Sequence, residues 1–213
     1  MVRAVARARA GRPGGGRTTV NTEPAAREVP EVFERLFADG QLQLLLDPSW
    51  TESEEAPNPP VEAIVGGWAI TGEGLRSRFC SNPGYRPSSP YAALDPVDGV
   101  LRVLVRGGDD AETITPHLPP ALFDTVLAIA VDEQGVALVR SAPDGAPSVL
   151  VATAYGHRAL LDVPGWLDVT LHDLAAALPE KGVDVLLNPG APASMRVPAD
   201  VVRDIVNAPD GEL

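Results

Sequence analysis

The side chains best suited to nucleophilic or acid–base chemistry are one cysteine and three histidines: Cys80, His117, His157 and His172. No two histidines stand three or four residues apart, the spacing that aims two imidazoles of one helix at a metal ion. Cys80 as a nucleophile needs a base such as His157 and a lowered thiol pKa. Nothing in the sequence positions that pair, so we expect no catalytic residue, and a hydrolase using Cys80 and His157 stays an alternative.

The absence of known catalytic motifs and the single cysteine also give no support to an enzyme. The chain contains no G-x-S-x-G, G-x-x-x-x-G-K-[ST], G-x-G-x-x-G or H-E-x-x-H pattern, so the corresponding hydrolase, phosphate, dinucleotide and zinc sites are not supported. A single cysteine excludes an intramolecular disulfide and a cysteine-based zinc cluster, and suits a reducing cytoplasm. No apolar run approaches the roughly 20 residues that span a bilayer. We therefore expect a cytoplasmic protein without metal or cofactor and without a membrane span.

Charge is distributed unevenly along the chain. Residues 1–28 hold six arginines and two glutamates, a charge of +4. Because the whole chain has a net charge of −12, the remaining 185 residues carry −16. Alanine, glycine and arginine cannot build a core, and we expect 1–28 to be disordered. The acidic body argues against nucleic acid as a partner and would attract a basic protein.

The stretch "CSNPGYRPSSPY", residues 80–91, is the best candidate for recognition of another protein. Three prolines and a glycine deny it regular structure and predict a loop. Tyr85, Arg86 and Tyr91 are of the residue types that dominate interface energies, and stiff prolines reduce the entropy lost on binding. In the competing interpretation the loop is a structural lid, with Tyr85 folded onto a sheet and Arg86 paired with a carboxylate.

Two short stretches are typical of structural turns. Asn82 and Pro83 interrupt the chain after a predicted strand. Asn188, Pro189 and Gly190 end another, because proline cannot continue a strand ladder and glycine allows the dihedral angles of a turn. We interpret both as corners rather than ligand-binding loops.

The hydrophobic pattern then predicts the elements that position these residues. Asp95 is suited to cap a helix that begins at Pro96 and ends at Gly107, and Thr170 to cap a second, whose apolar residues face a sheet. Further helices are predicted over 28–40 and from Pro198, and a helical turn near 156–161. Apolar runs predict strands over 41–46, 61–70, 74–79, 125–131, 136–140, 148–153, 166–170 and 183–188, three of which, 125–131, 136–140 and 148–153, would form an antiparallel meander.

This order of elements predicts an α+β fold, a mixed and largely antiparallel sheet with helices packed on it. We expect a helix, strands and the proline-rich loop in 29–118 and an α/β region in 119–208, packed together as one globular unit.

Residues 122–206, with "SVLVATAYGHRALL", "WLDVTLHDLAAALP" and a strand ending "LLNPG", resemble the N-terminal domain of the SseB family. The upstream "GGWAITGEGLRSRFCSNPGYRPS" and "DPVDGVLRVLVRG" resemble actinobacterial type VII secretion system-associated proteins, which join such a region to an SseB-like domain. The matching positions are Trp68, Asn82, Pro83, Tyr85, Arg86, Pro87, Asn188, Pro189 and Gly190.

The resemblance implies an SseB-like fold and an association with secretion loci, and it carries over no catalytic residue. We therefore expect a non-enzymatic accessory or adaptor that binds another protein, possible partners being a type VII secretion component or substrate. The alternative is an immunity-like or chaperone-like acidic protein that covers a basic secreted toxin or substrate.

Overall fold

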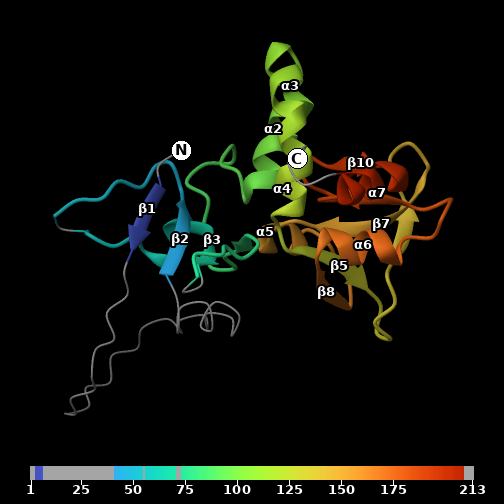
Figure 1. Cartoon of the computed structure of the whole chain (residues 1–213), viewed down its shortest axis with the longest axis horizontal. Coiled ribbons are helices and arrows are strands. Elements are labelled where there is room, and N and C mark those ends of the chain that lie inside the picture. The colour runs from blue at the N-terminus through green and yellow to red at the C-terminus, as the bar shows by residue number, and fades with distance from the viewer. Residues whose placement is uncertain (1–2, 7–40, 55, 71–72, 209–213) are drawn as a thin grey trace.

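The computed structural model describes residues 3–6, 41–54, 56–70 and 73–208, and the predicted helix over 28–40 lies outside them. Two β-sheets lie side by side, with helices α2, α3 and α4 rising between them (Figure 1). The larger sheet carries α6 and α7 (Figure 1). Within the described residues, no helix is long and apolar enough to cross a membrane.

The smaller sheet is antiparallel and has the order β1-β2-β3-β4. Alternate residues of β2, Leu42, Leu44 and Leu46, are buried, as the period of a strand requires. The predicted strand over 61–70 begins later than expected, at Ile64, because a 3-10 turn over Val61–Ala63 follows Pro60. The strands are β1 Arg3–Ala6, β2 Gln41–Leu46, β3 Ile64–Ile70 and β4 Cys80–Ser81.

Strand β1 falls within 1–28, the segment that we expected to be disordered. Its backbone pairs with β2, which offers a free edge on that side, so for these four residues the structure differs from the prediction. The other residues of the segment, 1–2 and 7–28, lie outside the described part of the chain.

The larger sheet has the order β10-β9-β7-β5-β8, and β6 pairs with β7 beside this path. Strands β7 and β9 are parallel, and the other pairs are antiparallel, so the sheet is mixed and largely antiparallel. Strands β5 and β7 pair directly, which differs from a simple meander. The strands are β5 Leu127–Val131, β6 Val139–Ser141, β7 Pro147–Ala152, β8 Gly165–Val169, β9 Asp184–Leu187 and β10 Met195–Val197.

One face of the larger sheet forms the main core. Helices α2, α4, α6 and α7 bury their apolar residues there against β5, β7 and β9. The side chain of Asp95 accepts the Asp98 N–H at the start of α2, and Thr170 and Asp173 form a capping box on α6, as their positions predicted. The helices are α2 Pro96–Arg106, α3 Asp109–Ile114, α4 Leu118–Phe123, α5 Tyr155–Arg158, α6 Leu171–Ala177 and α7 Ala199–Asn207, with a second 3-10 turn at Thr115–His117.

A short bridge joins the two sheets. Phe79, which is fully buried, pairs in parallel with Thr125 just before β5, and the Val126 N–H donates to the Phe79 carbonyl at 3.0 Å. The Trp68 indole donates to Asp124 at 2.9 Å, and Arg76 pairs with the same carboxylate. The fold is α+β as predicted, but it contains two sheets instead of one, because the strand pairing across this junction is limited to a single bridge.

Candidate functional site

Asn82 fixes the start of the proline-rich loop to the smaller sheet. Its side-chain amide donates to the carbonyls of Val61 and Ile64, both at 2.8 Å, and its side-chain oxygen accepts the Gly84 N–H at 2.9 Å. The residue is buried. Asn82 therefore holds a turn, and it presents no side-chain group to a partner.

Asp47, directly after β2, fastens the middle of the loop. Its carboxylate accepts the Tyr85 hydroxyl at 2.7 Å, the Ser88 N–H at 3.1 Å and the Ser88 hydroxyl at 2.7 Å, and it also accepts the Ser49 N–H and hydroxyl. Burial raises the pKa of Asp47, but the bonds from Ser49, Ser88 and Tyr85 outweigh burial and hold that pKa well below its ordinary value. The loop is thus tied to an ionised carboxylate.

Tyr85 does not project outward as a recognition residue would, so this part of the expectation is wrong. Its side chain is buried beside Val65, Trp68 and Phe79, because the ring fills the core of the smaller sheet while its hydroxyl finds Asp47. Arg86 is exposed, and its backbone N–H donates to the Glu62 carbonyl. Among the described residues, no carboxylate forms an ion pair with Arg86. Tyr85 fits the lid interpretation and Arg86 does not.

Tyr91 is the most exposed large apolar residue in the described part of the chain, with 86% of its surface accessible. Its backbone is nevertheless held, because the Tyr91 N–H donates to the Ser89 hydroxyl and Arg102 of α2 donates to the Pro90 carbonyl at 3.0 Å. The loop therefore presents an aromatic ring and the Arg86 guanidinium from a backbone that is fixed at both ends. Such an arrangement suits contact with another protein.

Asn188, Pro189 and Gly190 form the turn that ends β9. Asn188 is fully buried and has a backbone φ of 49°, a value that residues other than glycine rarely adopt. Gly190 has a φ of 82°. The Asn188 side chain accepts the Thr153 N–H at 2.9 Å and exchanges hydrogen bonds with the Thr153 hydroxyl. The turn ties β9 to β7 and does not present Asn188 to solvent.

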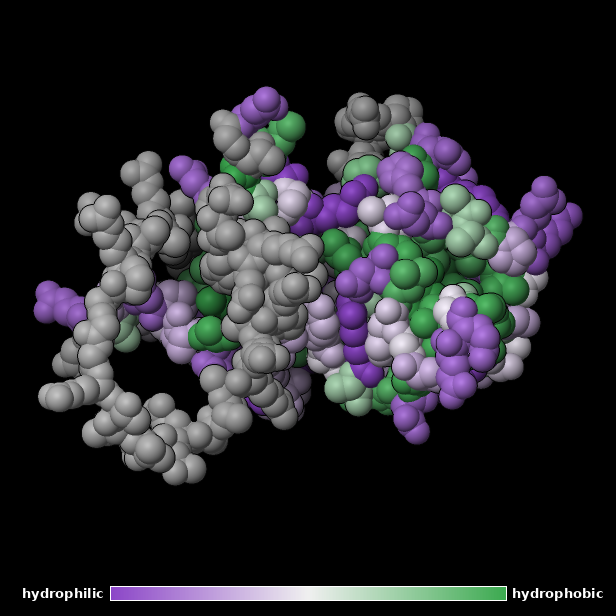
Figure 2. Space-filling view, turned by 90° about the horizontal axis from the view of Figure 1, so that it is seen from below, coloured by the Kyte–Doolittle hydropathy of each residue, from purple (hydrophilic) through white to green (hydrophobic). Residues whose placement is uncertain are grey.

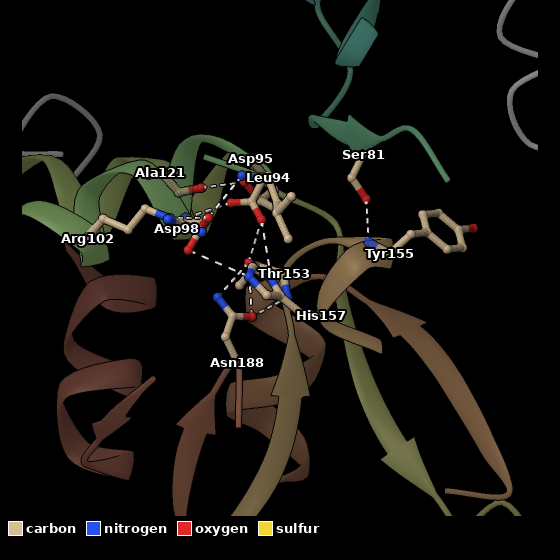
Figure 3. A network of polar contacts seen from close by, with 11 residues as sticks. Ser81, Leu94, Asp95, Asp98, Arg102, Ala121, Thr153, Tyr155, His157 and Asn188 are labelled. Atoms are coloured by element: carbon tan, nitrogen blue, oxygen red, sulfur yellow. Dashed lines mark hydrogen bonds and ion pairs between the residues drawn. The ribbon is translucent and has the colours of Figure 1, made fainter. Parts of the chain in front are cut away.

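Sequence reasoning missed a buried cluster formed by Asp95, Asp98, Thr153, His157 and Asn188. It lies where the N-terminus of α2 meets the ends of β7 and β9, with His157 on α5 (Figure 3). Each member is at most 2% exposed. The only advance signal was Asp95 as a helix cap, and no local pattern connects it with residues 58 to 93 positions later.

The His157 ring lies between two carboxylates. Its Nδ1 is 3.4 Å from the Thr153 hydroxyl and 3.9 Å from Asp95 Oδ2, and its Nε2 is 3.6 Å from Asp98 Oδ1. Among the described residues, neither Nε2 nor Asp98 Oδ1 has a hydrogen-bond partner. Burial of such groups costs free energy unless a proton makes their contact attractive.

The two carboxylates have opposite shifts. Burial raises the pKa of Asp95, against the lowering effect of the Thr153 hydroxyl, the Asp98 N–H and nearby His157. Burial also raises the pKa of Asp98, but the adjacent His157, the Leu94 N–H and Arg102 together outweigh it and lower that pKa. Asp98 is therefore the ionised partner of Arg102, whereas burial raises the pKa of Asp95.

Cys80 and His157 do not form a catalytic pair in this structure. The ring nitrogens of His157 face Thr153, Asp95 and Asp98, and in the described part of the chain no hydrogen bond joins the ring to Cys80. Burial, and then the charge of Asp168, raises the pKa of the half-buried Cys80 thiol, which disfavours the nucleophilic thiolate.

The remaining titratable and apolar groups do not assemble a second site. Across the described ranges, no three His, Cys, Asp or Glu side chains are grouped to hold a metal ion. His117 and His172 are exposed, and His172 meets the edge of Phe123. Hydrophobic residues are also visible on the surface of the larger sheet and its helices, which we call the larger sheet unit (Figure 2). Val136 and Leu160 are among the exposed apolar residues of that unit.

Comparison of the chain with family models, with curated proteins and with solved structures found no match.

Proposed function

We propose that this protein is a non-enzymatic adaptor that binds another protein through the exposed side chains of its proline-rich loop, Arg86 and Tyr91. The observation that carries the proposal is the 86% exposure of Tyr91 on a loop whose backbone is held by Asp47 and Arg102. An exposed aromatic ring gains most from burial at an interface, and a fixed backbone loses little entropy on binding.

Two observations support a binding role over catalysis. His157, the only buried histidine in the described residues, is 1% exposed, so a substrate cannot reach it without movement of α2 or α5. The Cys80 thiol is held in its protonated form by a raised pKa. General acid–base catalysis requires a group within hydrogen-bond reach of the substrate, and the buried His157 does not meet that requirement.

The identity of the partner is proposed from sequence resemblance alone. The resemblance to type VII secretion system-associated proteins with an SseB-like region makes a secretion component or a secreted substrate the first partner to test. The protein would act in the cytoplasm, in keeping with a single, unpaired cysteine.

An acidic surface favours a second candidate, an immunity-like or chaperone-like protein that covers a basic secreted protein. Helix α3 carries Asp109, Asp110 and Glu112, all exposed, at the end of the helices that rise between the sheets (Figure 1). Association through this region would slow as salt rises, because charge steers the encounter. Binding by Tyr91 would depend less on salt.

Site-specific photo-crosslinking in the native cell tests the loop as an interface. A photoreactive residue replaces Tyr91 in one variant and Val136, which is 61% exposed on the larger sheet unit, in the control. We expect a discrete crosslinked product only from position 91, identified by mass spectrometry. Equal products from both positions, or none from position 91, would contradict the proposal.

A third variant separates the two candidate functions. A photoreactive residue at Glu112 of α3 gives the discrete product if the acidic helices contact a basic partner. A product at 112 with none at 91 would replace the adaptor by the immunity-like or chaperone-like protein.

A further inference from the structure

We propose that the buried cluster is a proton-dependent clasp, in which one proton, bound by either His157 or Asp95, holds α2 against the sheet and fixes the loop that carries Tyr91. The clasp does not depend on the proposed function. Only its consequence for partner binding, through the position of Tyr91, rests on that function.

A bound proton follows from the contacts of His157. Its Nε2 and Asp98 Oδ1 lie 3.6 Å apart without other partners, so only a proton on Nε2 makes the contact attractive. On the other side of the ring, Nδ1 lies 3.9 Å from Asp95 Oδ2. Asp95 Oδ2 also accepts the Thr153 hydroxyl at 2.6 Å. If Nδ1 and Asp95 are both deprotonated, two atoms that carry lone pairs face each other in a buried site, and a proton on either removes the repulsion.

The neighbouring charges support retention of that proton. From α2, Asp95 and Asp98 face the ring, and Arg102 neutralises Asp98 from behind at 2.8 Å. The other two members of the cluster are Thr153, which directly follows β7, and Asn188, which directly follows β9. Neither carries a charge. On α5 itself, the Arg158 guanidinium stacks on Tyr155 and pairs with Asp168. One carboxylate, that of Asp95, is thus left without a cation unless the cluster holds a proton, in agreement with the raised pKa of Asp95.

A continuous chain of contacts links this proton to the loop. Asp98 Oδ2 accepts the Leu94 N–H at 2.9 Å and the Arg102 Nε–H at 2.8 Å. Arg102 Nη1 in turn donates to the Pro90 carbonyl at 3.0 Å, next to Tyr91 (Figure 3 shows the part from His157 to Arg102). A shift of Asp98 away from His157 therefore moves both ends of the segment between Pro90 and Leu94.

The sign of the pH dependence follows from proton linkage. A folded state that holds the proton of the clasp more tightly than the unfolded chain loses stability as pH rises, by at most about tenfold in the unfolding equilibrium constant per pH unit for one proton. The loss begins above the ordinary pKa of the groups in the unfolded chain and ends where the folded cluster has released the proton. Loosening of α2 and of the loop accompanies that release.

Nuclear magnetic resonance on the isolated full-length protein tests the clasp without any partner. The pH is varied from about 5 to 9, the range in which histidine and perturbed carboxyl groups titrate. We expect the signals of the His157 ring, of the Asp95 carboxyl group and of the Tyr91 and Leu94 amides to shift with one common midpoint. In His172→Gln, which changes an exposed histidine, the same shifts should remain.

Two outcomes would overturn the clasp. One is a His157 ring signal and Asp95 carboxyl signal that stay constant over the whole range, since no proton would then be exchanged. The other is a titration of the cluster that leaves the Tyr91 and Leu94 amides unmoved. Both are measured on the wild-type protein, so the test does not depend on whether a variant of the cluster folds. Failure of the crosslink at position 91 would leave these shifts unaffected, which separates the clasp from the proposed function.

Discussion

The hydroxyl of Tyr85 donates a hydrogen bond of 2.7 Å to Asp47, 38 residues earlier in the chain, and the two residues are buried together. This contact divides the proline-rich loop into two parts with different roles. Tyr85 anchors the loop to the smaller sheet, and Arg86 and Tyr91 stay at the surface.

Removal of the Tyr85 hydroxyl should destabilise the protein. In Tyr85→Phe the ring keeps its packing, but Asp47 loses one charge-assisted hydrogen bond, for which we expect a loss of about 2 kcal/mol in the free energy of unfolding. Urea denaturation followed by circular dichroism measures it. Tyr91→Phe is the control and should change stability by less than about 0.5 kcal/mol. Equal stability of the two variants would disprove the anchoring role of Tyr85.

Acid should destabilise the protein partly through Asp47. Its pKa is lowered in the folded state from an ordinary 3.8, so the unfolded chain binds the proton more readily. The stability that Asp47 contributes is present above the ordinary pKa and is lost as pH falls through it towards the folded value. Denaturation curves between about pH 3 and 6 should show a steeper loss for the wild type than for Asp47→Asn. Parallel curves would show that Asp47 is not the group responsible.

Two glycine-to-alanine substitutions should change the stability of the protein in opposite directions. A Cβ at Gly67 in β3 would lie 2.8 Å from the Gln43 carbonyl of the paired strand, and we expect Gly67→Ala to cost about 2 kcal/mol or more. At Gly99 in α2 the nearest atom would be the Ala93 Cβ at 3.7 Å, and Gly99→Ala should gain about 0.5 to 1 kcal/mol from helix propensity. Thermal melting checks both, and a stabilised Gly67→Ala would contradict the close pairing of β2 and β3.

Asn188 combines an unusual backbone with buried hydrogen bonds. Asn188→Ala leaves the Thr153 N–H without its partner and places alanine at a φ of 49°, so we expect a loss of about 2 to 4 kcal/mol. Asn188→Gly loses the same side-chain bonds without the backbone strain and should be about 1 kcal/mol more stable than Asn188→Ala. Chemical denaturation of the two variants measures the difference. If alanine proved as stable as glycine, the positive φ would carry no strain.

Local sequence signals predicted the elements with strong caps or strict periodicity. Strand β2 has the predicted bounds, and α2 and α6 have the predicted N-caps, Asp95 and Thr170. No local pattern predicts the helices α3 and α4 within 109–123, because the prolines of this segment obscure the helical periodicity. In α7, Val202 and Ile205 are buried, whereas Val201 beside them is 42% exposed, which the apolar run alone does not distinguish.

Contacts between distant residues were beyond the reach of sequence patterns. The burial of Tyr85 depends on the carboxylate of Asp47, and the buried cluster brings Asp95, the N-cap of α2, to Thr153, 58 residues later. The prolines indicated the loop correctly, but the direction of each side chain depends on where the body of the protein offers space and a partner. Tyr85 fills a space in the core and has a partner for its hydroxyl, whereas among the described residues Tyr91 has neither.

The affinity of the crosslinked partner for loop variants tests the proposed function most directly. Each variant is purified and its Kd for that partner is measured by titration calorimetry, together with its melting temperature. We predict that Arg86→Ala combined with Tyr91→Ala weakens binding at least about tenfold at an unchanged melting temperature, as expected for an exposed interface centre. An unchanged Kd in this double variant would contradict recognition by the loop.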